Sequence, residues 1–303
     1  MLIRTRELLA EGVRHHEIRA QVRSGQLIRV RHGVYRRIEA LAGGDADGIE
    51  QHLAKVAATL PGFGDGAVLS HQSAALMHGL PLPPRLIGAV HVTRPGHSGR
   101  VSGSVHLHRA QLPQEEVVVG EHGPMTSLAQ TAVDLARVLP PVHAVALLDH
   151  ALRLGAGQEL LLELTDSRRN AGNVQARRLI RFADGLSESV GESHSRWLMH
   201  ELGLPAPILQ HKILTPKGQF VARSDFWWPE CNVVGEFDGK VKYGRDLKPG
   251  QTIADVVLLE KQREEAIRRQ GPWVIRWIWK DLDDRKGFAE FLSRALRLGK
   301  RAA

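Results

Sequence analysis

The stretch that decides the fold is Phe220-Val221-Ala222-Arg223-Ser224-Asp225-Phe226-Trp227-Trp228, followed after a short turn by Val233-Val234-Gly235-Glu236-Phe237-Asp238-Gly239-Lys240. Both segments are apolar enough for buried strands, yet they carry three acids. A carboxylate in an apolar strand costs several kcal/mol unless it is paired, hydrogen-bonded or bound to a cation. Because side chains alternate along a strand, Glu236 and Asp238 share one face, and the neighbouring strand can bring Asp225 beside Glu236. This pattern predicts an acidic centre that a hard divalent ion would hold together.

The segments around these strands predict one compact unit. A helix over 188–202 precedes an antiparallel meander of strands over 208–214, 219–228 and 232–237, and a helix over 257–270 leads to a last strand over 273–279. All six tryptophans lie in this part of the chain, which favours a core of its own. The polar loop over 243–251 is a candidate lid or DNA-contacting loop, or else an ordinary surface connection.

This arrangement resembles the PD-(D/E)XK nuclease fold over residues 187–300, and within it the very-short-patch-repair endonuclease-like group. The resemblance implies that a helix supplies a glutamate, here Glu192, and that two strands supply Asp225 and Glu236. Two positions depart from the pattern. Asp238 stands where the fold's name places lysine, and the group's Glu-x-Asp-Gly-x-x-His ends here in Lys242.

The chemistry that the resemblance implies is metal-assisted phosphodiester hydrolysis with Mg²⁺ or Mn²⁺ as the cofactor. Asp225, Glu236 and the backbone carbonyl of Phe237 would hold the ion, and Glu192 would complete the shell directly or through a water. A lysine, Lys242 or in its place Lys240, would stabilise charge on the phosphate or orient the attacking water.

The candidate catalytic residues are Glu192, Asp225, Glu236, Asp238, Lys240 and Lys242. Two cations further along the chain, Arg263 and Arg276, are candidate DNA-binding residues that could grip a phosphate. The alternative for both arginines is a salt bridge to Glu260 or Glu264.

The first 37 residues are strongly basic. They contain nine arginines and three glutamates, which is a net charge of +6 out of the +8 of the whole chain. The pattern predicts a helix that ends near Gly12, a helix over 14–24 and an alternating run over 26–35 that forms a hairpin. Helix, turn, helix and hairpin is the order of a winged helix, in which one helix enters the DNA major groove and the hairpin touches the backbone.

The candidate DNA-binding residues of this module lie on its second helix and on the hairpin: Arg14, His15, His16, Arg19, Arg23, Arg29, Arg31 and Arg36. Arginines clustered on a small module are the electrostatic footprint of phosphate binding. The alternatives are a solvated face and a winged helix that contacts only protein.

Residues 48–155 mix helices with short strands. Helices are predicted over 49–60, 70–78, 127–139 and 142–155, and strands over 89–93, 105–108 and 116–119. The histidines of this region, among them His71, His78, His91, His106 and His108, do not show the sequence spacing of a metal site. We therefore expect structural roles for them.

A second resemblance, to the AbiEi-type antitoxin and transcriptional-regulator family, covers residues 1–155. It rests on Gly33-Val34-Tyr35, on Leu69-Ser70-His71-Gln72-Ser73-Ala74-Ala75, on His78-Gly79-Leu80 and on Thr126-Ser127 with 131–136. The resemblance implies that the winged helix binds operator DNA and represses its own operon. It also implies that the middle domain serves assembly or contact with a partner, such as a cognate toxin.

Length and composition set the remaining expectations. A chain of 303 residues exceeds what one core supports, so we expect an α+β multi-domain protein. Its parts are a winged helix-turn-helix over 1–40, an α/β middle domain over 48–155, a helical linker over 156–186, and a restriction-endonuclease-like α/β domain with a mixed sheet over 187–300. The lone Cys231 excludes an internal disulfide framework. No segment is apolar enough to span a membrane, so we expect a cytoplasmic protein without membrane contact.

Two functions follow from these patterns. The first is a Mg²⁺-dependent DNA endonuclease, in defence or repair, that its winged helix guides to DNA. The second is an antitoxin-type transcriptional repressor whose nuclease-like domain is inactive. The sequence leaves open the oligomeric state, the DNA site and whether DNA or RNA is the substrate.

Overall fold

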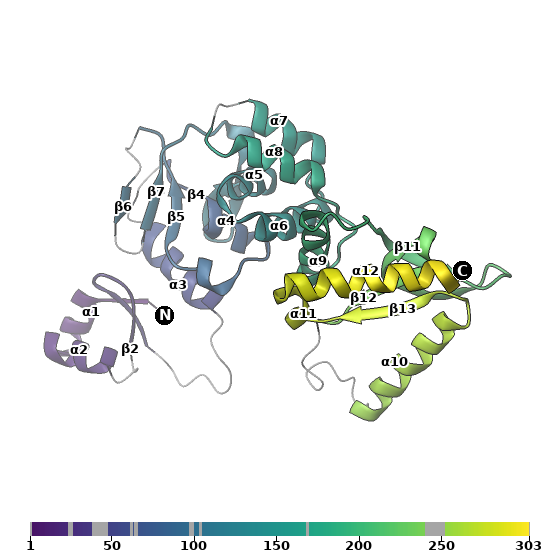
Figure 1. Cartoon of the computed structure of the whole chain (residues 1–303). Helices are drawn as coiled ribbons and strands as arrows, with labels where there is room; N and C mark the ends of the chain where they lie inside the picture. The colour runs from purple at the N-terminus through teal and green to yellow at the C-terminus, as the bar shows by residue number, and fades with distance from the viewer. Residues whose placement is uncertain are drawn as a thin grey trace. The chain divides into compact units, whose positions relative to one another are not determined.

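The protein is a mixed α+β chain that divides into two compact units, residues 1–138 with 156–176 and residues 139–155 with 177–303 (Figure 1). The structure is a computed structural model, and it describes residues 2–23, 27–37, 48–60, 63, 66–96, 100–102, 105–167, 170–239 and 252–302. The multi-domain α+β class predicted from the sequence is confirmed. The four-part division into domains stays a prediction, since α6 groups by its contacts with the C-terminal unit.

The N-terminal module consists of two short helices and a three-stranded antiparallel sheet. Its elements are β1 (Leu2–Arg4), α1 (Thr5–Ala10), α2 (His15–Arg23), β2 (Leu27–Arg31) and β3 (Val34–Arg37), with the strand order β1-β3-β2. The helices end and begin where the sequence predicts, because Gly12 adopts a left-handed φ of 86° between them. Ile3, Leu8, Ile18 and Leu27 fill the core of the module. β1 was not predicted.

The middle of the chain is built on a six-stranded sheet in the order β6-β7-β5-β4-β9-β8. Its elements are α3 (Gly48–Thr59), β4 (Val68–Leu69), α4 (His71–Met77), β5 (Val90–Thr93), β6 (Arg100–Ser102), β7 (Val105–His108), β8 (Val117–Gly120), β9 (Gly123–Thr126), α5 (Leu128–Val138) and α7 (Gln158–Asp166). Both α3 and α4 contact β5, and α5 packs against α4 and α7. The predicted helices and strands of this region are all present, while β4, β6 and β9 were missed.

The C-terminal unit holds a mixed four-stranded sheet in the order β10-β11-β12-β13, antiparallel except for the parallel pair β12–β13. Its elements are α6 (Pro141–Arg153), α9 (Val190–Glu201), β10 (Ile208–Leu214), β11 (Phe220–Trp228), β12 (Val233–Phe237), α10 (Ile253–Arg268), β13 (Trp273–Trp277), α11 (Trp279–Asp283) and α12 (Arg285–Ala302). α8 (Asn173–Phe182) crosses from one unit into the other. The predicted order of helix, three strands, helix and strand is therefore observed.

Two details of this unit differ from the prediction. The last strand ends at Trp277 rather than Trp279, because Trp279 begins α11. The long helix α12 was not predicted, although Phe288, Leu292, Ala295 and Leu296 recur at helical spacing and pack into the same core as Phe226 and Trp277. Figure 1 shows α12 alongside β12 and β13.

None of the helices that the structure describes combines the length and the apolar character of a membrane-spanning segment.

A close approach between β12 and β13 fixes the middle of this core. A Cβ atom added to Gly235 would lie 2.6 Å from the ring of Trp277, whose Nε1 donates a hydrogen bond of 2.8 Å to Ser195 Oγ of α9. Only glycine leaves room for the indole, so this one residue allows the strand, the ring and the helix to pack together.

Substitution Gly235→Ala is expected to destabilise the C-terminal unit by about 1–3 kcal/mol, because the added methyl overpacks the core. All six tryptophans belong to this unit, so tryptophan fluorescence during urea unfolding reports on it. Lys217→Ala, at an exposed position of the same unit, is the control. Equal midpoints for the two variants would contradict the packing argument.

Candidate functional site

The acidic centre lies where β11, β12 and the start of α9 meet. Phe226 of β11 pairs with Gly235 of β12, which makes Asp225 and Glu236 the next opposite residues. Asp225 Oδ2 accepts a hydrogen bond of 2.9 Å from the backbone N–H of Phe237. The register therefore brings these two carboxylates together, as the alternation of the strands predicted.

Glu192 reaches the same place from the first turn of α9. Ser189 caps this helix, because its Oγ accepts the backbone N–H of Glu192 at 3.1 Å, and it donates in turn to Glu192 Oε1 at 2.7 Å. Glu192 Oε2 accepts from the backbone N–H of Glu188 and from Gln210 Nε2, both at 2.9 Å. Glu192 is only 7% exposed, and three hydrogen bonds, from Ser189, Glu188 and Gln210, hold its carboxylate in one position.

Glu236 is buried to the same degree and lies between two arginines. Its Oε1 lies 2.7 Å from Arg263 Nη2 of α10, and its Oε2 lies 3.0 Å from Arg276 Nη2 of β13. Oε1 makes an ion pair but no hydrogen bond of good geometry. Arg276 also approaches Glu264 at 3.5 Å. Both arginines thus pair with Glu236, which was not predicted as their partner; of the two predicted partners, Glu264 approaches Arg276.

The pKa of the Asp225 carboxyl is strongly raised. Burial is the main cause that raises its pKa from 3.8 to about 7, and the charge of Glu192 and then that of Glu236 add to the effect. The N–H of Phe237 and the charge of Arg263 oppose the rise. At neutral pH this carboxyl is therefore protonated in part of the molecules, unless a bound cation displaces the proton.

The three acids line a cleft of about 440 Å³. Its other lining residues are Ser189, Val190, Gly191, Phe237, Asp238, Gly239, Glu260, Arg263, Arg276 and Trp279. The cleft therefore unites Glu192, Asp225, Glu236, Asp238 and both predicted arginines. The predicted lysines Lys240 and Lys242, and the loop over 243–251, lie outside the described residues.

Glu192, Asp225 and Glu236 do not yet form a tight ligand set. Among the residues that the structure describes, the one group of three His, Cys, Asp or Glu side chains with ligand atoms within 4.8 Å of one another is His71, His91 and His108. Glu236 is paired with Arg263 and Arg276, and the carboxylate of Glu192 is hydrogen-bonded at the start of α9. The assignment of catalytic and metal residues stays a prediction.

The N-terminal module exposes its cations. Arg14, His15, His16 and Arg19 are exposed on or beside α2, and Arg29 is exposed on β2. The side chains of Arg23, Arg31 and Arg36 are not among those described. Buried Ile18 anchors α2 to the core, while His15 and Arg19, four residues apart on the same side of the helix, are exposed.

Two of the three glutamates in this module are engaged with the backbone. Glu7 Oε2 accepts the N–H of Arg4, and Glu17 Oε2 accepts the N–H of Arg14, both at 2.7 Å. Each bond satisfies a free N–H at the start of a helix. These two acids therefore serve as helix caps.

The fold and these surfaces define a multi-domain α+β protein whose N-terminal module has two short helices, a three-stranded sheet and exposed cations. Residues 2–38 match a family model described as "Transcriptional regulator, AbiEi antitoxin". That match confirms the resemblance of the module to this regulator class.

The chain is also similar to two proteins of Mycobacterium tuberculosis, "Uncharacterized protein Rv2248" of strain ATCC 25618 / H37Rv and "Uncharacterized protein MT2308" of strain CDC 1551 / Oshkosh. Each is 31% identical over 263 residues, which is 82% of this chain and 92% of the relative. The chain belongs to the family of these two proteins. A solved structure, "Crystal structure of RV2827C protein from Mycobacterium tuberculosis", is similar at 16% identity and a TM-score of 0.40, over 72% of this chain and 85% of that one.

The pKa of Asp225 makes the stability of the C-terminal unit depend on pH. The folded unit keeps a proton that the unfolded chain loses between pH 3.8 and about 7, so the contribution of Asp225 is fully present at lower pH and is lost as the pH rises through this window. In EDTA, the free energy of unfolding of the wild type is expected to fall by an amount on the order of 2–4 kcal/mol between pH 4 and 7 because of Asp225. The variant Asp225→Asn should not show this fall.

Urea unfolding followed by tryptophan fluorescence at several pH values measures this difference. Glu230 of the same unit is exposed, and Glu230→Gln is the control. Its free energy of unfolding should change with pH as in the wild type. If the free energy of unfolding had the same pH dependence in the wild type and in Asp225→Asn, the pKa of this carboxyl would not be raised by folding.

Proposed function

We propose that this protein is a DNA-binding transcriptional regulator of the antitoxin type, and that its N-terminal module recognises an operator. The observation that carries the proposal is the match of residues 2–38 to the AbiEi regulator model. The remainder of the chain would then serve assembly, contact with a toxin, or both.

The charges of the module support this function. His15 and Arg19 are exposed on one side of α2, next to the buried Ile18, and would be the residues that a recognition helix presents to the major groove. Arg29, exposed on the hairpin, would contact the phosphate backbone. With the three glutamates counted, residues 1–37 keep a net charge of +6, which would attract DNA.

The double variant Arg14→Ala/Arg19→Ala is expected to bind DNA at least tenfold more weakly than the wild type. The slope of the logarithm of its binding constant against the logarithm of the salt concentration should correspond to about two fewer phosphate contacts. Each arginine that binds a phosphate releases counterions from the DNA. Fluorescence anisotropy at several salt concentrations measures both effects. Arg85→Ala/Arg109→Ala removes two exposed arginines of the middle domain as a control of equal charge. If both pairs weaken binding equally, the module has no special role.

The cleft supports a second candidate function, metal-dependent cleavage of a phosphodiester. The specific observation is the pKa of Asp225, which burial and two neighbouring acids raise to about 7. Acids that repel one another in a cleft are typical of catalytic sites. The helix-strand-strand-strand-helix-strand order is also the one that the PD-(D/E)XK resemblance implies.

The donor set of the cleft fits a hard cation. Asp225, Glu236, Glu192 and the carbonyl of Phe237 offer oxygen ligands, which Mg²⁺ or Mn²⁺ prefers, and Glu236 Oε1 is buried without a hydrogen bond. When bound, the ion would polarise the scissile phosphate and lower the pKa of an attacking water. Arg263 and Arg276, which now neutralise Glu236, would turn to the phosphate of the substrate.

Asp225→Asn and Glu236→Gln are each expected to abolish Mg²⁺- or Mn²⁺-dependent nicking of supercoiled DNA and to leave DNA binding in EDTA unchanged. Glu230→Gln, outside the cleft, should cut like the wild type. Cleavage that survives in both cleft variants would overturn the residue assignment. Absence of cleavage by the wild type on supercoiled, linear, nicked and mismatched DNA would leave regulation as the sole function.

A further inference from the structure

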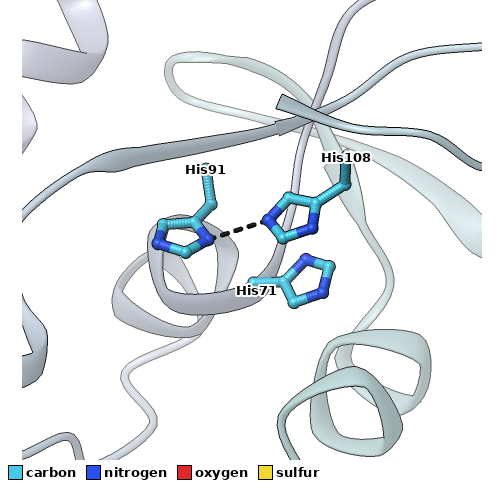
Figure 2. Close-up of side chains that lie close together, drawn as sticks. All are labelled: His71, His91 and His108. Atoms are coloured by element: carbon cyan, nitrogen blue, oxygen red, sulfur yellow. Dashed lines mark hydrogen bonds between the residues drawn. The ribbon is translucent and has the colours of Figure 1, made fainter. Parts of the chain in front are cut away.

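Three histidines from separate segments of the middle domain meet on one face of its sheet (Figure 2). His71 is the first residue of α4, His91 lies in β5 and His108 ends β7. One ring nitrogen of each lies within 4.8 Å of the other two. His91 Nδ1 and His108 Nε2 share a hydrogen bond of 2.9 Å, and the ring of His71 stacks on that of His108 with centroids 3.7 Å apart.

The sheet holds two of these residues in place by its register. β5 and β7 run parallel, with His91 opposite His106 and Thr93 opposite His108. Residues opposite each other, and those two positions along a strand, share one face. His91 and His108 therefore project from neighbouring rigid strands to the same side.

The third residue is held by the turn that leads into α4. His71 adopts a left-handed φ of 49°, which a residue other than glycine rarely does. Its Nδ1 lies 3.0 Å from Ser70 Oγ, which accepts a hydrogen bond of 2.8 Å from Thr93 Oγ1 of β5. An unfavourable backbone conformation and a chain of hydrogen bonds thus hold this ring beside the other two, stacked on His108.

The spacing of the nitrogens suits a transition metal. Two imidazole ligands of a tetrahedral Zn²⁺, each at 2.0–2.1 Å, place their nitrogens about 3.3 Å apart. The His91–His108 distance of 2.9 Å differs from this by a few tenths of an ångström. To reach the same spacing from its limit of 4.8 Å, the nitrogen of His71 must move by at most about 1.5 Å. The ring must also turn out of its stack on His108, so that a nitrogen lone pair faces the ion.

A metal ion would replace a proton at this cluster. His91 Nδ1 and His108 Nε2 share a hydrogen bond of 2.9 Å, so one of the two nitrogens carries a proton toward the other. Binding of an ion requires the loss of that proton, and the affinity is therefore expected to fall at low pH.

We propose that His71, His91 and His108 form a Zn²⁺ site in the middle domain, with a water or the adjacent His106 as fourth ligand. The ring of His106 stacks on that of His108 at 4.3 Å. A set of imidazoles selects Zn²⁺ and its transition-metal neighbours over Mg²⁺, so this site differs in chemistry from the acidic cleft. The ion would tie the start of α4 to β5 and β7 and stabilise the domain, independently of either proposed function.

The test uses the untagged full-length chain, because a histidine tag would itself bind Zn²⁺. After treatment with a chelator, the chain is titrated with Zn²⁺ against a chromophoric competitor, and the folding of every variant is checked by circular dichroism. The wild type is expected to bind one ion per chain. His71→Ala and His108→Ala are expected to lose at least tenfold in affinity and to lose the rise in melting temperature that Zn²⁺ gives the wild type.

Two control variants show whether the ion binds at the histidine cluster or elsewhere on the chain. His78→Gln alters a histidine of the same domain whose Nε2 contacts the Thr126 carbonyl, and Asp225→Asn alters the cleft; both should bind Zn²⁺ like the wild type. X-ray absorption of the Zn²⁺-loaded wild type should show at least three imidazole ligands, which tests the site even where a variant fails to fold. No Zn²⁺ binding, binding unaffected by the His71 and His108 variants, or loss in Asp225→Asn alone would overturn the proposal.

Discussion

The hydrogen bond from the Phe237 N–H to Asp225 is the interaction on which the C-terminal site depends. It forms at the end of the β11–β12 ladder and holds an acid inside an apolar sheet, next to Glu236 and the capped Glu192. Burial of three like charges is unfavourable, and the protein lessens this cost in two ways. Arg263 and Arg276 neutralise Glu236, and Asp225 keeps a pKa near 7. A cation, or the phosphates of a nucleic acid that attract the arginines, would change this balance.

Short-range patterns were enough to predict most elements and the acidic cleft. Strand alternation placed Asp225 beside Glu236, and the turn residue Gly12 separated the two N-terminal helices as expected. β1 and β4 were missed because strands of two or three residues show no period, and their pairing depends on partners far along the chain. The apolar stripe of α12, from Phe288 to Leu296, was a signal that could have been found.

The histidine cluster shows a different limit. His71, His91 and His108 are spread over 38 positions of the sequence, so no metal-binding spacing is visible, and the expectation of purely structural roles did not foresee their meeting. The parallel register of β5 and β7 and the left-handed turn at His71 create the cluster. Both depend on the tertiary fold, as does the partnership of Arg263 and Arg276 with Glu236.

Selection of binding sites from random-sequence DNA, in EDTA, tests the central claim of a regulator most directly. EDTA silences a metal-dependent nuclease but leaves the basic module intact. The account predicts that the wild-type chain enriches one defined sequence, and that this sequence occurs in the promoter of its own gene. Recovery of unselected DNA alone, with equal affinity for all sequences, would contradict it.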